Sequence, residues 1–207
     1  MNYKEKTVAR GAEAIVYKLG SKVVKDRIPK GYRHPDLDNK LRTRRTKSEE
    51  KLLSKASEIV STPKPLITSS SSDNYKIHMP YIPGKKLSEH LDKLKNYQTI
   101  CKKIGQSLAK LHDAGLIHGD LTTSNLILTK NNKVFFIDFG LGFHSTRIED
   151  KAVDLHLISQ ALEAKHSSIH EKAFKSILQG YKSSKNYQET IKRLEKVESR
   201  GRYKKQY

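Results

Sequence analysis

Four polar residues lie at fixed spacings in the middle of the sequence. His118 and Asp120 are two positions apart in LIHGDLTTSNLIL, and Asn125 follows Asp120 by five positions. Asp138 follows Asn125 by thirteen positions, inside FFIDFG. Carboxylate and amide oxygens are hard ligands of the kind that magnesium prefers, and phosphate oxygens and water complete its shell. The pattern therefore indicates phosphoryl transfer, which needs charge neutralisation and in-line positioning more than covalent chemistry.

Each of these residues receives a role from its chemistry. Asn125 and Asp138 are the predicted metal ligands, because they supply oxygens from the two sides of a predicted hairpin. Asp120 is the predicted catalytic residue, which orients or deprotonates the attacking oxygen. His118 is expected to support the loop. A single Asp or Asn in a loop is usually unremarkable, but two matched clusters in this order favour a site.

The upstream sequence offers partners for a nucleotide. Lys25 ends a predicted strand in VVK and can reach the α- and β-phosphates. A helix is predicted over residues 37–59, and Glu49 heads its apolar face. An inward carboxylate needs a cationic partner, so Glu49 is expected to hold Lys25.

The adenine end of the nucleotide site is predicted from two short segments. In ARGAEAIVYK only Gly11 lies in the turn, which makes a poor glycine-rich loop. In HMPYIPG, Met79 is expected to line the back of the pocket. The carbonyl of Pro80 and the amide of Ile82 are then placed to bond the base, and proline loses nothing when only its carbonyl is used.

The order of the predicted elements indicates an α+β fold with two lobes. Short strands are predicted in residues 7–26, a strand near 75–82, a hinge at 82–87, an amphipathic helix over 99–114, a hairpin with Asn131 and Asn132 at its tip, and helices from Glu149. We expect a β-rich N-lobe with one long helix at 1–82, a truncated and mainly helical C-lobe at 83–197, and a mobile basic tail at 198–207.

The composition points to a charged partner. The 207 residues include 41 Lys and Arg but 22 Asp and Glu, giving a net charge of +19. Such an excess favours RNA or DNA, although a solvated lysine-rich surface is the plain alternative. Cys101 is the only cysteine, which fits a reducing cytosol, and no apolar run is long enough for a membrane span. A cytoplasmic protein with no membrane partner is expected.

Together, IHGDLTTSNLIL, IDFGLGF, EDKAVDL and SRGR resemble the small atypical kinase subunit of the KEOPS complex, the PRPK family. The resemblance covers essentially the whole chain. It implies a protein-kinase-like fold, ATP and magnesium as cofactors, ATP hydrolysis, and Ser/Thr phosphorylation. It also implies a role in forming threonylcarbamoyl-adenosine in transfer RNA, beside a threonylcarbamoyl-transferase catalytic subunit. Asp154 matches a helix residue that braces the catalytic loop.

The chain departs from most protein kinases at two places. Gly119 stands where they carry Arg, and so cannot pair with a phosphorylated activation loop. Fifteen residues separate Asp138 from Asp154, with no Ala-Pro-Glu segment for a substrate peptide. We therefore expect an ATPase or restricted kinase that works in an assembly, with a partner docking on Gly140–Ile148.

Two other functions remain open from the sequence. Small-molecule kinases of the aminoglycoside or choline type share the His-Gly-Asp pattern, but they need a larger helical lobe, and 67 residues follow Gly140. A non-enzymatic RNA-binding scaffold subunit would explain the charge, but has no need of the full set of site residues. The tail, with its four cations between Arg200 and Lys205, is expected to contact transfer RNA or a partner.

Overall fold

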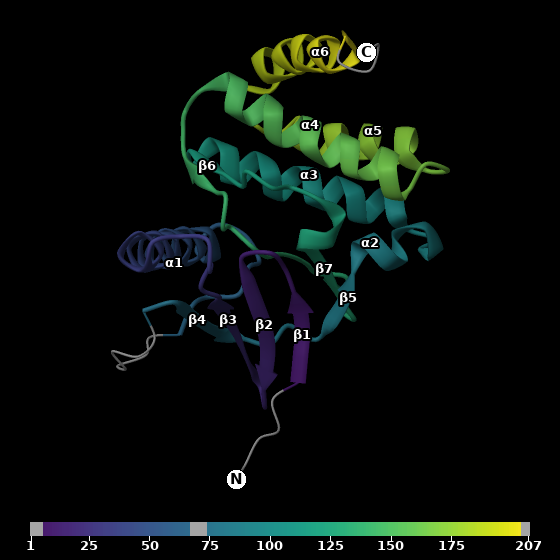
Figure 1. Ribbon diagram of the computed structural model, residues 1–207. Helices are drawn as coiled ribbons and strands as arrows, with labels where there is room; N and C mark the ends of the chain where they lie inside the picture. The colour runs from purple at the N-terminus through teal and green to yellow at the C-terminus, as the bar shows by residue number, and fades with distance from the viewer. Residues whose placement is uncertain (1–5, 67–73, 204–207) are drawn as a thin grey trace.

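The computed structural model describes residues 6–66 and 74–203, and it has two lobes (Figure 1). A β-sheet and one long helix form the N-lobe, and helices dominate the C-lobe. This is the α+β, protein-kinase-like architecture expected from the sequence. No helix in the described ranges is both long and apolar enough to cross a membrane.

The N-lobe sheet is antiparallel and follows the chain order. Its strands are β1 (Lys6–Arg10), β2 (Ala14–Leu19), β3 (Lys22–Arg27) and β4 (Lys76–Pro80). Helix α1 (Pro35–Ser57) lies beside this sheet, begins with a proline and carries two acidic residues in its first turn. Both features favour a helix start, because proline presets the backbone and carboxylates complement the helix dipole. The helix buries Leu52, Leu53 and Ala56 in the core.

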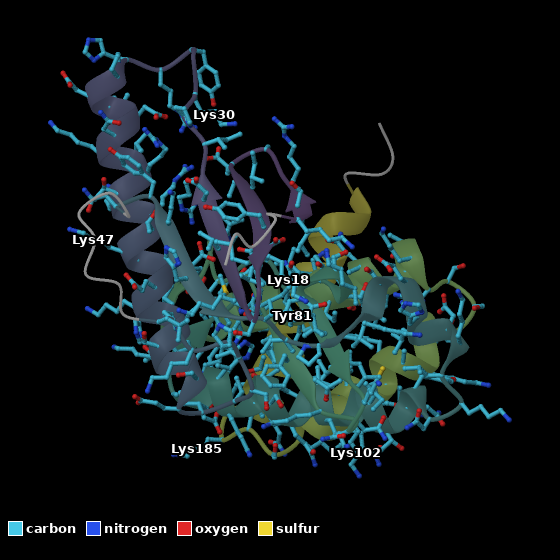
Figure 2. The ribbon with its side chains drawn as sticks, turned by 90° about the horizontal axis from the view of Figure 1, so that it is seen from below. Lys18, Lys30, Lys47, Tyr81, Lys102 and Lys185 are labelled. Atoms are coloured by element: carbon cyan, nitrogen blue, oxygen red, sulfur yellow. The ribbon has the colours of Figure 1, made fainter. Side chains whose placement is uncertain are left out.

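A short link joins the lobes. Strand β4 ends at Pro80, and β5 (Gly84–Lys86) already pairs with β7 (Leu126–Thr129) of the C-lobe. In the link, the ammonium of Lys18 lies 3.8 Å from the centroid of the Tyr81 ring (Figure 2). This cation–π contact ties the link to β2.

The predicted hairpin is present. Strand β7 pairs with β8 (Val134–Phe136), and Asn132 takes a φ of 55° in the turn between them. Asn tolerates this left-handed conformation better than most residues. The hairpin places Asn125 just before one strand and Asp138 just after the other.

The C-lobe is a stack of helices. Its elements are α2 (Leu87–His90), the 3-10 turn η2 (Leu91–Lys93), α3 (Tyr97–Asp113), β6 (Leu116–Ile117), the 3-10 turn η3 (Thr123–Asn125), β9 (Phe143–His144), α4 (Ile148–Lys165), α5 (His170–Tyr181) and α6 (Tyr187–Tyr203). Helix α3 packs mainly on α5, and α4 packs on α6 (Figure 1). The predicted helix over 99–114 is confirmed as α3.

Two glycines bring α3 and α5 into close contact. A Cβ atom on Gly105 of α3 would collide with the carbonyl oxygen of Ile177 in α5. A Cβ atom on Gly180 of α5 would collide with the carbonyl oxygen of Lys102 in α3. The backbones of the two helices therefore approach more closely than any other residue type would allow.

The basic tail predicted from Glu198 begins inside a helix. Helix α6 runs on to Tyr203, and residues 204–207 lie outside the described ranges. The absence of an apolar period gave no sign of this helix. A helix that is already nucleated gains one hydrogen bond with each further residue, so it can continue through a segment without such a period.

Candidate active site

Four charged residues meet between the lobes, and we name them the cleft cluster: Lys25, Arg27, Glu49 and Asp138. The ammonium of Lys25 on β3 lies 2.7 Å from Oε1 of Glu49 on α1. The same ammonium lies 2.7 Å from Oδ1 of Asp138, which follows β8. The predicted contact between Lys25 and Glu49 is therefore present, and the structure brings Asp138 to it.

Arg27 completes the cleft cluster and was missed by the sequence reasoning. Its guanidinium lies 2.5 Å from Oε2 of Glu49, so this carboxylate is held from both sides. Arg27 follows Lys25 by two positions on β3, and alternate residues of a strand share a face. That spacing was a usable signal, but one more cation in so basic a sequence did not stand out.

Burial and charge act in opposite directions on the two carboxylates. Burial raises the pKa of Glu49, while Lys25 and Arg27 oppose that rise. For Asp138, burial would also raise the pKa, but the Lys25 ammonium and the Gly140 amide bring it below its usual value. Asp138 is therefore ionised and ready to accept a cation at neutral pH.

The backbone of Asp138 is held in an uncommon conformation. Its φ is 65°, in the left-handed region that costs a residue with a side chain about 1–2 kcal/mol. The amide of Gly140 donates a hydrogen bond to Oδ1 of Asp138 at 3.2 Å. Strained backbone held by its surroundings is concentrated at functional sites.

The catalytic loop places Asp120 next to Asn125. The side-chain amide of Asn125 donates to the backbone carbonyl of Asp120 at 2.8 Å and to its carboxylate at 3.0 Å. These bonds use the nitrogen of the amide and leave its oxygen for another ligand. Asp120 and Asn125, five positions apart in the chain, thus act as one unit.

A buried carboxylate supports this loop from below. Asp154 on α4 accepts hydrogen bonds from the backbone amides of His118 at 2.7 Å and Gly119 at 2.8 Å. It also contacts Nε2 of His112 on α3 at 3.2 Å. The bracing role implied for Asp154 by the family resemblance is confirmed by these contacts.

His118 joins the loop to the segment before Asp138. Its Nδ1 accepts a hydrogen bond from the amide of Asp120 at 3.3 Å, so Nε2 carries the proton and donates to the carbonyl of Ile137 at 3.1 Å. Burial lowers the pKa of His118, although Asp154 opposes this change. The ring is therefore neutral, as its acceptor role requires, and it supports the loop as predicted.

The structure explains the glycine at position 119. Gly119 has a φ of 77°, and a Cβ atom there would collide with the carbonyl oxygen of Leu141. Leu141 belongs to the short segment after Asp138, which is fixed to the loop because β9 pairs with β6. An arginine at this position is therefore excluded by backbone conformation and by space.

A cavity of about 200 Å³ opens beside the cleft cluster. Its lining includes Lys25, Glu49, Asn125 and Asp138, and also Met79, Pro80, Ile82, Val16 and Val23. Its surface is mostly apolar, which suits a planar base. The predicted residues Gly11 and Asp120 are outside this lining; the amide of Gly11 donates to the carbonyl of Ala14 at 2.9 Å in the β1–β2 turn.

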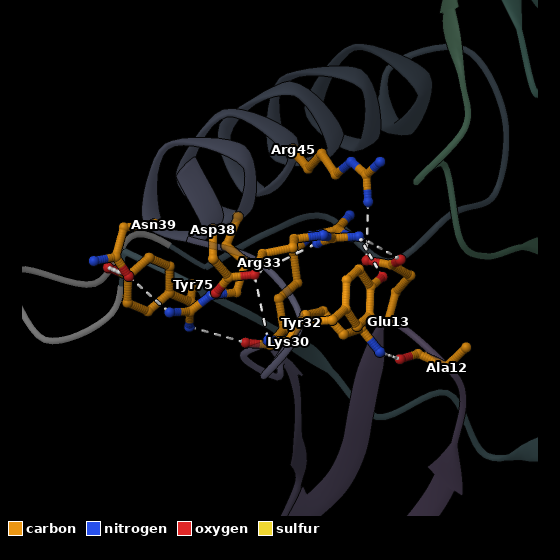
Figure 3. Close-up of polar contacts among 11 residues, drawn as sticks. Ala12, Glu13, Lys30, Tyr32, Arg33, Asp38, Asn39, Arg45 and Tyr75 are labelled. Atoms are coloured by element: carbon orange, nitrogen blue, oxygen red, sulfur yellow. Dashed lines mark hydrogen bonds and ion pairs between the residues drawn. The ribbon is translucent and has the colours of Figure 1, made fainter. Parts of the chain in front are cut away.

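The β1–β2 turn is tied to α1 by a second group of charges, shown in Figure 3. We name it the rim cluster: Glu13, Arg33, Asp38, Arg42 and Arg45. Oε2 of Glu13 lies 2.9 Å from Arg45, and Oδ2 of Asp38 lies 2.6 Å from Arg42. The Lys30 ammonium also donates to the carbonyl of Ala12 in the same turn. The turn that would cover phosphates is therefore anchored through side chains, which compensates for its shortage of glycines.

Magnesium fits the donor set on chemical grounds. Asn125 offers a free amide oxygen, and Asp138 offers an ionised carboxylate on the opposite side of the hairpin. Among the described residues, no group of three or more His, Cys, Asp or Glu side chains could hold a metal by itself. Magnesium commonly binds through one or two carboxylates together with substrate phosphates, so this set suits an ion that arrives with a nucleotide.

The fold and this site define a protein-kinase-like protein. Residues 4–156 match the protein kinase domain family. The structure of WbdD in complex with the kinase inhibitor LY294002 has a TM-score of 0.54 and 16% identity, over 84% of this chain and 44% of that one. That likeness concerns the fold.

The chain belongs to the Bud32 family of protein-kinase-like proteins. It is 38% identical to the KEOPS complex subunit Bud32 of Pyrococcus abyssi, over 96% of each chain. It is also 38% identical to a probable serine/threonine-protein kinase BUD32 homolog of Archaeoglobus fulgidus, over 93% of this chain and 94% of the homolog. A probable bifunctional tRNA threonylcarbamoyladenosine biosynthesis protein of Methanobrevibacter smithii is 42% identical over 95% of this chain, which spans 36% of that protein.

Proposed function

We propose that this chain is the ATP-hydrolysing, kinase-like subunit of a KEOPS complex and serves the formation of threonylcarbamoyladenosine in transfer RNA. The observation that carries the proposal is the Lys25–Glu49 ion pair, which faces Asp138 across the cleft. The match over nearly the full length of a KEOPS subunit supports the assignment to that complex. The bifunctional relatives are named for threonylcarbamoyladenosine biosynthesis, which supports the product.

In this proposal each residue of the site has one task. Lys25 binds the phosphates of ATP, while Glu49 and Arg27 hold one another in place behind it. Asn125 and Asp138 would hold magnesium, which when bound neutralises charge on the phosphates. Asp120 orients the attacking oxygen and accepts its proton, and Asn125 fixes the direction of its carboxylate.

Water or a restricted acceptor suits this site better than a wide range of protein substrates. The segment after Asp138 reaches α4 at Ile148 and is fixed by the β6–β9 pair. Protein kinases lay substrate peptides on a longer segment at this place. The ATP site is thus complete while the peptide platform is absent from these described residues.

The same short segment offers a docking surface for the catalytic subunit. Leu141 is 66% exposed and Phe143 is 43% exposed. Exposed Val153 comes from the first turns of α4, close after this segment in the chain. Large apolar side chains exposed together mark protein interaction sites, so we assign this surface to the threonylcarbamoyl-transferase subunit. Transfer RNA is the proposed second partner, through the basic surface and the segment 198–207.

The test is release of radiolabelled phosphate from ATP by the chain alone, with the cognate transferase subunit, and with transfer RNA. Phosphate should be released in magnesium, and the rate should change when the transferase subunit is added. A small-molecule kinase would instead transfer the label to an added aminoglycoside or to choline. If no phosphate is released under any of these conditions, the enzymatic proposal is wrong and a scaffold role replaces it.

A further inference from the structure

The outer face of α1 carries a row of cations, which we name the lysine stripe. Its members are Lys40, Arg44, Lys47, Lys51 and Lys55, and all are exposed. They follow one another by three or four positions. At 3.6 residues per turn they fall within an arc of about 80°, so they form one line along the helix. Lys55 follows Lys40 by fifteen positions, which is about 22 Å of helix.

The stripe has two carboxylates near its ends, exposed Asp36 four positions before Lys40 and exposed Glu58 three positions after Lys55, so its five cations are only partly balanced. Glu49 lies on the opposite, buried face of α1, where the cleft cluster holds it. Glu50 is turned about 100° away from the centre of the stripe. Among the described residues, no ion pair joins a stripe member to a carboxylate. Like charges in a row repel one another, so the stripe favours an anionic partner from outside.

The chemistry of the stripe distinguishes between two kinds of partner. Protein interfaces have an apolar core and are depleted in lysine. The stripe consists of four lysines and one arginine, and Leu37 is the one exposed large apolar side chain of α1, lying in its first turn. A phosphate backbone needs cations at intervals and no apolar contact. The charge pattern therefore fits a nucleic acid better than an acidic protein.

The length of the stripe suits a double helix. A duplex carries one phosphate charge per roughly 1.7 Å of its axis, so about 22 Å of stripe faces roughly a dozen charges. The stripe ends at Lys55, whose ammonium lies 3.1 Å from Nε2 of His144 in β9. It therefore leads from the first turns of α1 to the short segment beside the catalytic loop.

We infer that the lysine stripe binds the phosphate backbone of a double-helical arm of RNA. The choice of RNA over DNA rests on the proposed function, whereas the choice of a phosphate backbone rests on the stripe alone. Because the stripe and Glu49 lie on opposite faces of one helix, the surface is separate from the ATP site. The stripe reads no bases, so its binding is independent of sequence.

The experiment replaces the five stripe residues with Gln, which keeps a good helix former at each position. The matched control replaces five exposed lysines of the helical lobe: Lys102, Lys172, Lys175, Lys182 and Lys185. Figure 2 labels Lys47 beside α1, and Lys102 and Lys185 at the lower edge of the view. Circular dichroism checks the fold of both variants. Affinity for an unmodified transfer RNA transcript is then measured over a salt series.

The stripe variant should bind RNA at least about tenfold more weakly at moderate salt, and its log–log salt slope should be shallower by about four. In the control variant, the salt slope should change by less than half of the change seen in the stripe variant. Equal slopes for the two variants would overturn the inference. A polyglutamate probe that depends on the stripe, with RNA binding that does not, would overturn it in favour of an acidic protein.

The proposed function is tested separately in the same samples. ATP turnover without RNA should be the same in the stripe variant and the parent, because the ATP site is untouched. A DNA hairpin that binds the stripe as tightly as an RNA hairpin of the same sequence would remove the preference for RNA. An absence of ATP turnover in the parent would count against the proposed function but would not affect the conclusion about RNA binding by the stripe.

Discussion

The cleft cluster and the rim cluster are built from the same residue types but sit in different surroundings. In the cleft cluster, the side chain of Glu49 is 1% exposed and Arg27 is 6% exposed. In the rim cluster, the Glu13–Arg45 pair is 44% and 40% exposed. Water screens the second pair but hardly reaches the first.

This difference in exposure separates the contacts that position the site residues from the contacts that anchor the β1–β2 turn. Removing one member of a buried ion pair leaves an uncompensated charge, which costs several kcal/mol. Exposed pairs contribute little, because solvation competes with the contact. The cleft cluster should therefore dominate both activity and stability. In the rim cluster the exposed Glu13–Arg45 pair should have a small effect, whereas the Asp38–Arg42 pair, 5% and 12% exposed, belongs with the buried pairs.

Asp138→Ala should abolish ATP turnover. The change removes a predicted magnesium ligand and a partner of Lys25, while the half-exposed position lets the fold survive. Phosphate release and circular dichroism measure the two effects. Turnover at the parental rate would show that the cleft cluster does not carry the chemistry.

Asp120→Asn should slow turnover by about two to four decades and leave the binding of ATP with magnesium nearly unchanged. Asn keeps the shape of the side chain but cannot accept a proton. Calorimetric binding and single-turnover rates separate the two quantities. Lost affinity with unchanged turnover per bound ATP would contradict the assigned role.

Arg27→Gln should lower the free energy of unfolding by about 3 kcal/mol, because Glu49 keeps Lys25 but loses its second cation in a buried place. Arg27→Lys should restore much of this loss, since it returns the positive charge. Urea denaturation provides the measurement. A change below about 1 kcal/mol would put Arg27 in the same class as the exposed pairs.

The effect of burial on an ionisable side chain can be tested through His118 and the pH dependence of stability. Its pKa in the folded chain lies below the ordinary value of 6.5, chiefly because burial disfavours the cation. As pH falls below 6.5, His118 binds a proton in the unfolded chain but stays neutral in the folded chain. The contribution of neutral His118 is therefore complete above that pH and is lost below it, by up to about 1.4 kcal/mol per pH unit. His118→Gln should flatten the profile of unfolding free energy between pH 6.5 and 5, and parallel profiles would exclude this source.

Arg45→Gln should change the free energy of unfolding by less than about 1 kcal/mol. Its pair with Glu13 is exposed on both sides, and Arg33 still contacts the same carboxylate at 3.4 Å. The same urea series used for Arg27→Gln gives a direct comparison. A loss as large as that of Arg27→Gln would erase the distinction between the two clusters.

The sequence predicted the parts of the site that have periodic or spaced signals. The pairing of Lys25 with Glu49 followed from the apolar face of α1, and the hairpin followed from its Asn-rich turn. Arg27 shares a strand face with Lys25 and contacts the same carboxylate, but it was missed because one more cation in so basic a sequence did not stand out. The reason for Gly119 was also hidden, because the collision with Leu141 depends on how the later segment folds back. The roles of the site residues stay predictions until the variants are measured.

The helix within the predicted tail was hidden for a related reason. Sequence patterning finds the apolar face that a helix buries, and residues 198–203 have no apolar period although α6 runs to Tyr203. The N-lobe and C-lobe boundaries at 82 and 83 remain an interpretation of the sequence. What the sequence could not supply was the set of contacts between elements, since burial and backbone geometry arise from the whole fold.

The glycine pair between α3 and α5 has a consequence for how the chain can change over time. Gly105 and Gly180 touch no charge, ligand or catalytic group, yet each faces the backbone of the other helix. Even the methyl group of alanine would force the helices apart, and a close-packed lobe has few ways to absorb that shift. Substitutions that leave the fold unchanged should therefore accumulate mainly on the lysine-covered surface of this lobe. Gly105 and Gly180 should not tolerate substitution, although nothing in their chemistry marks them as important.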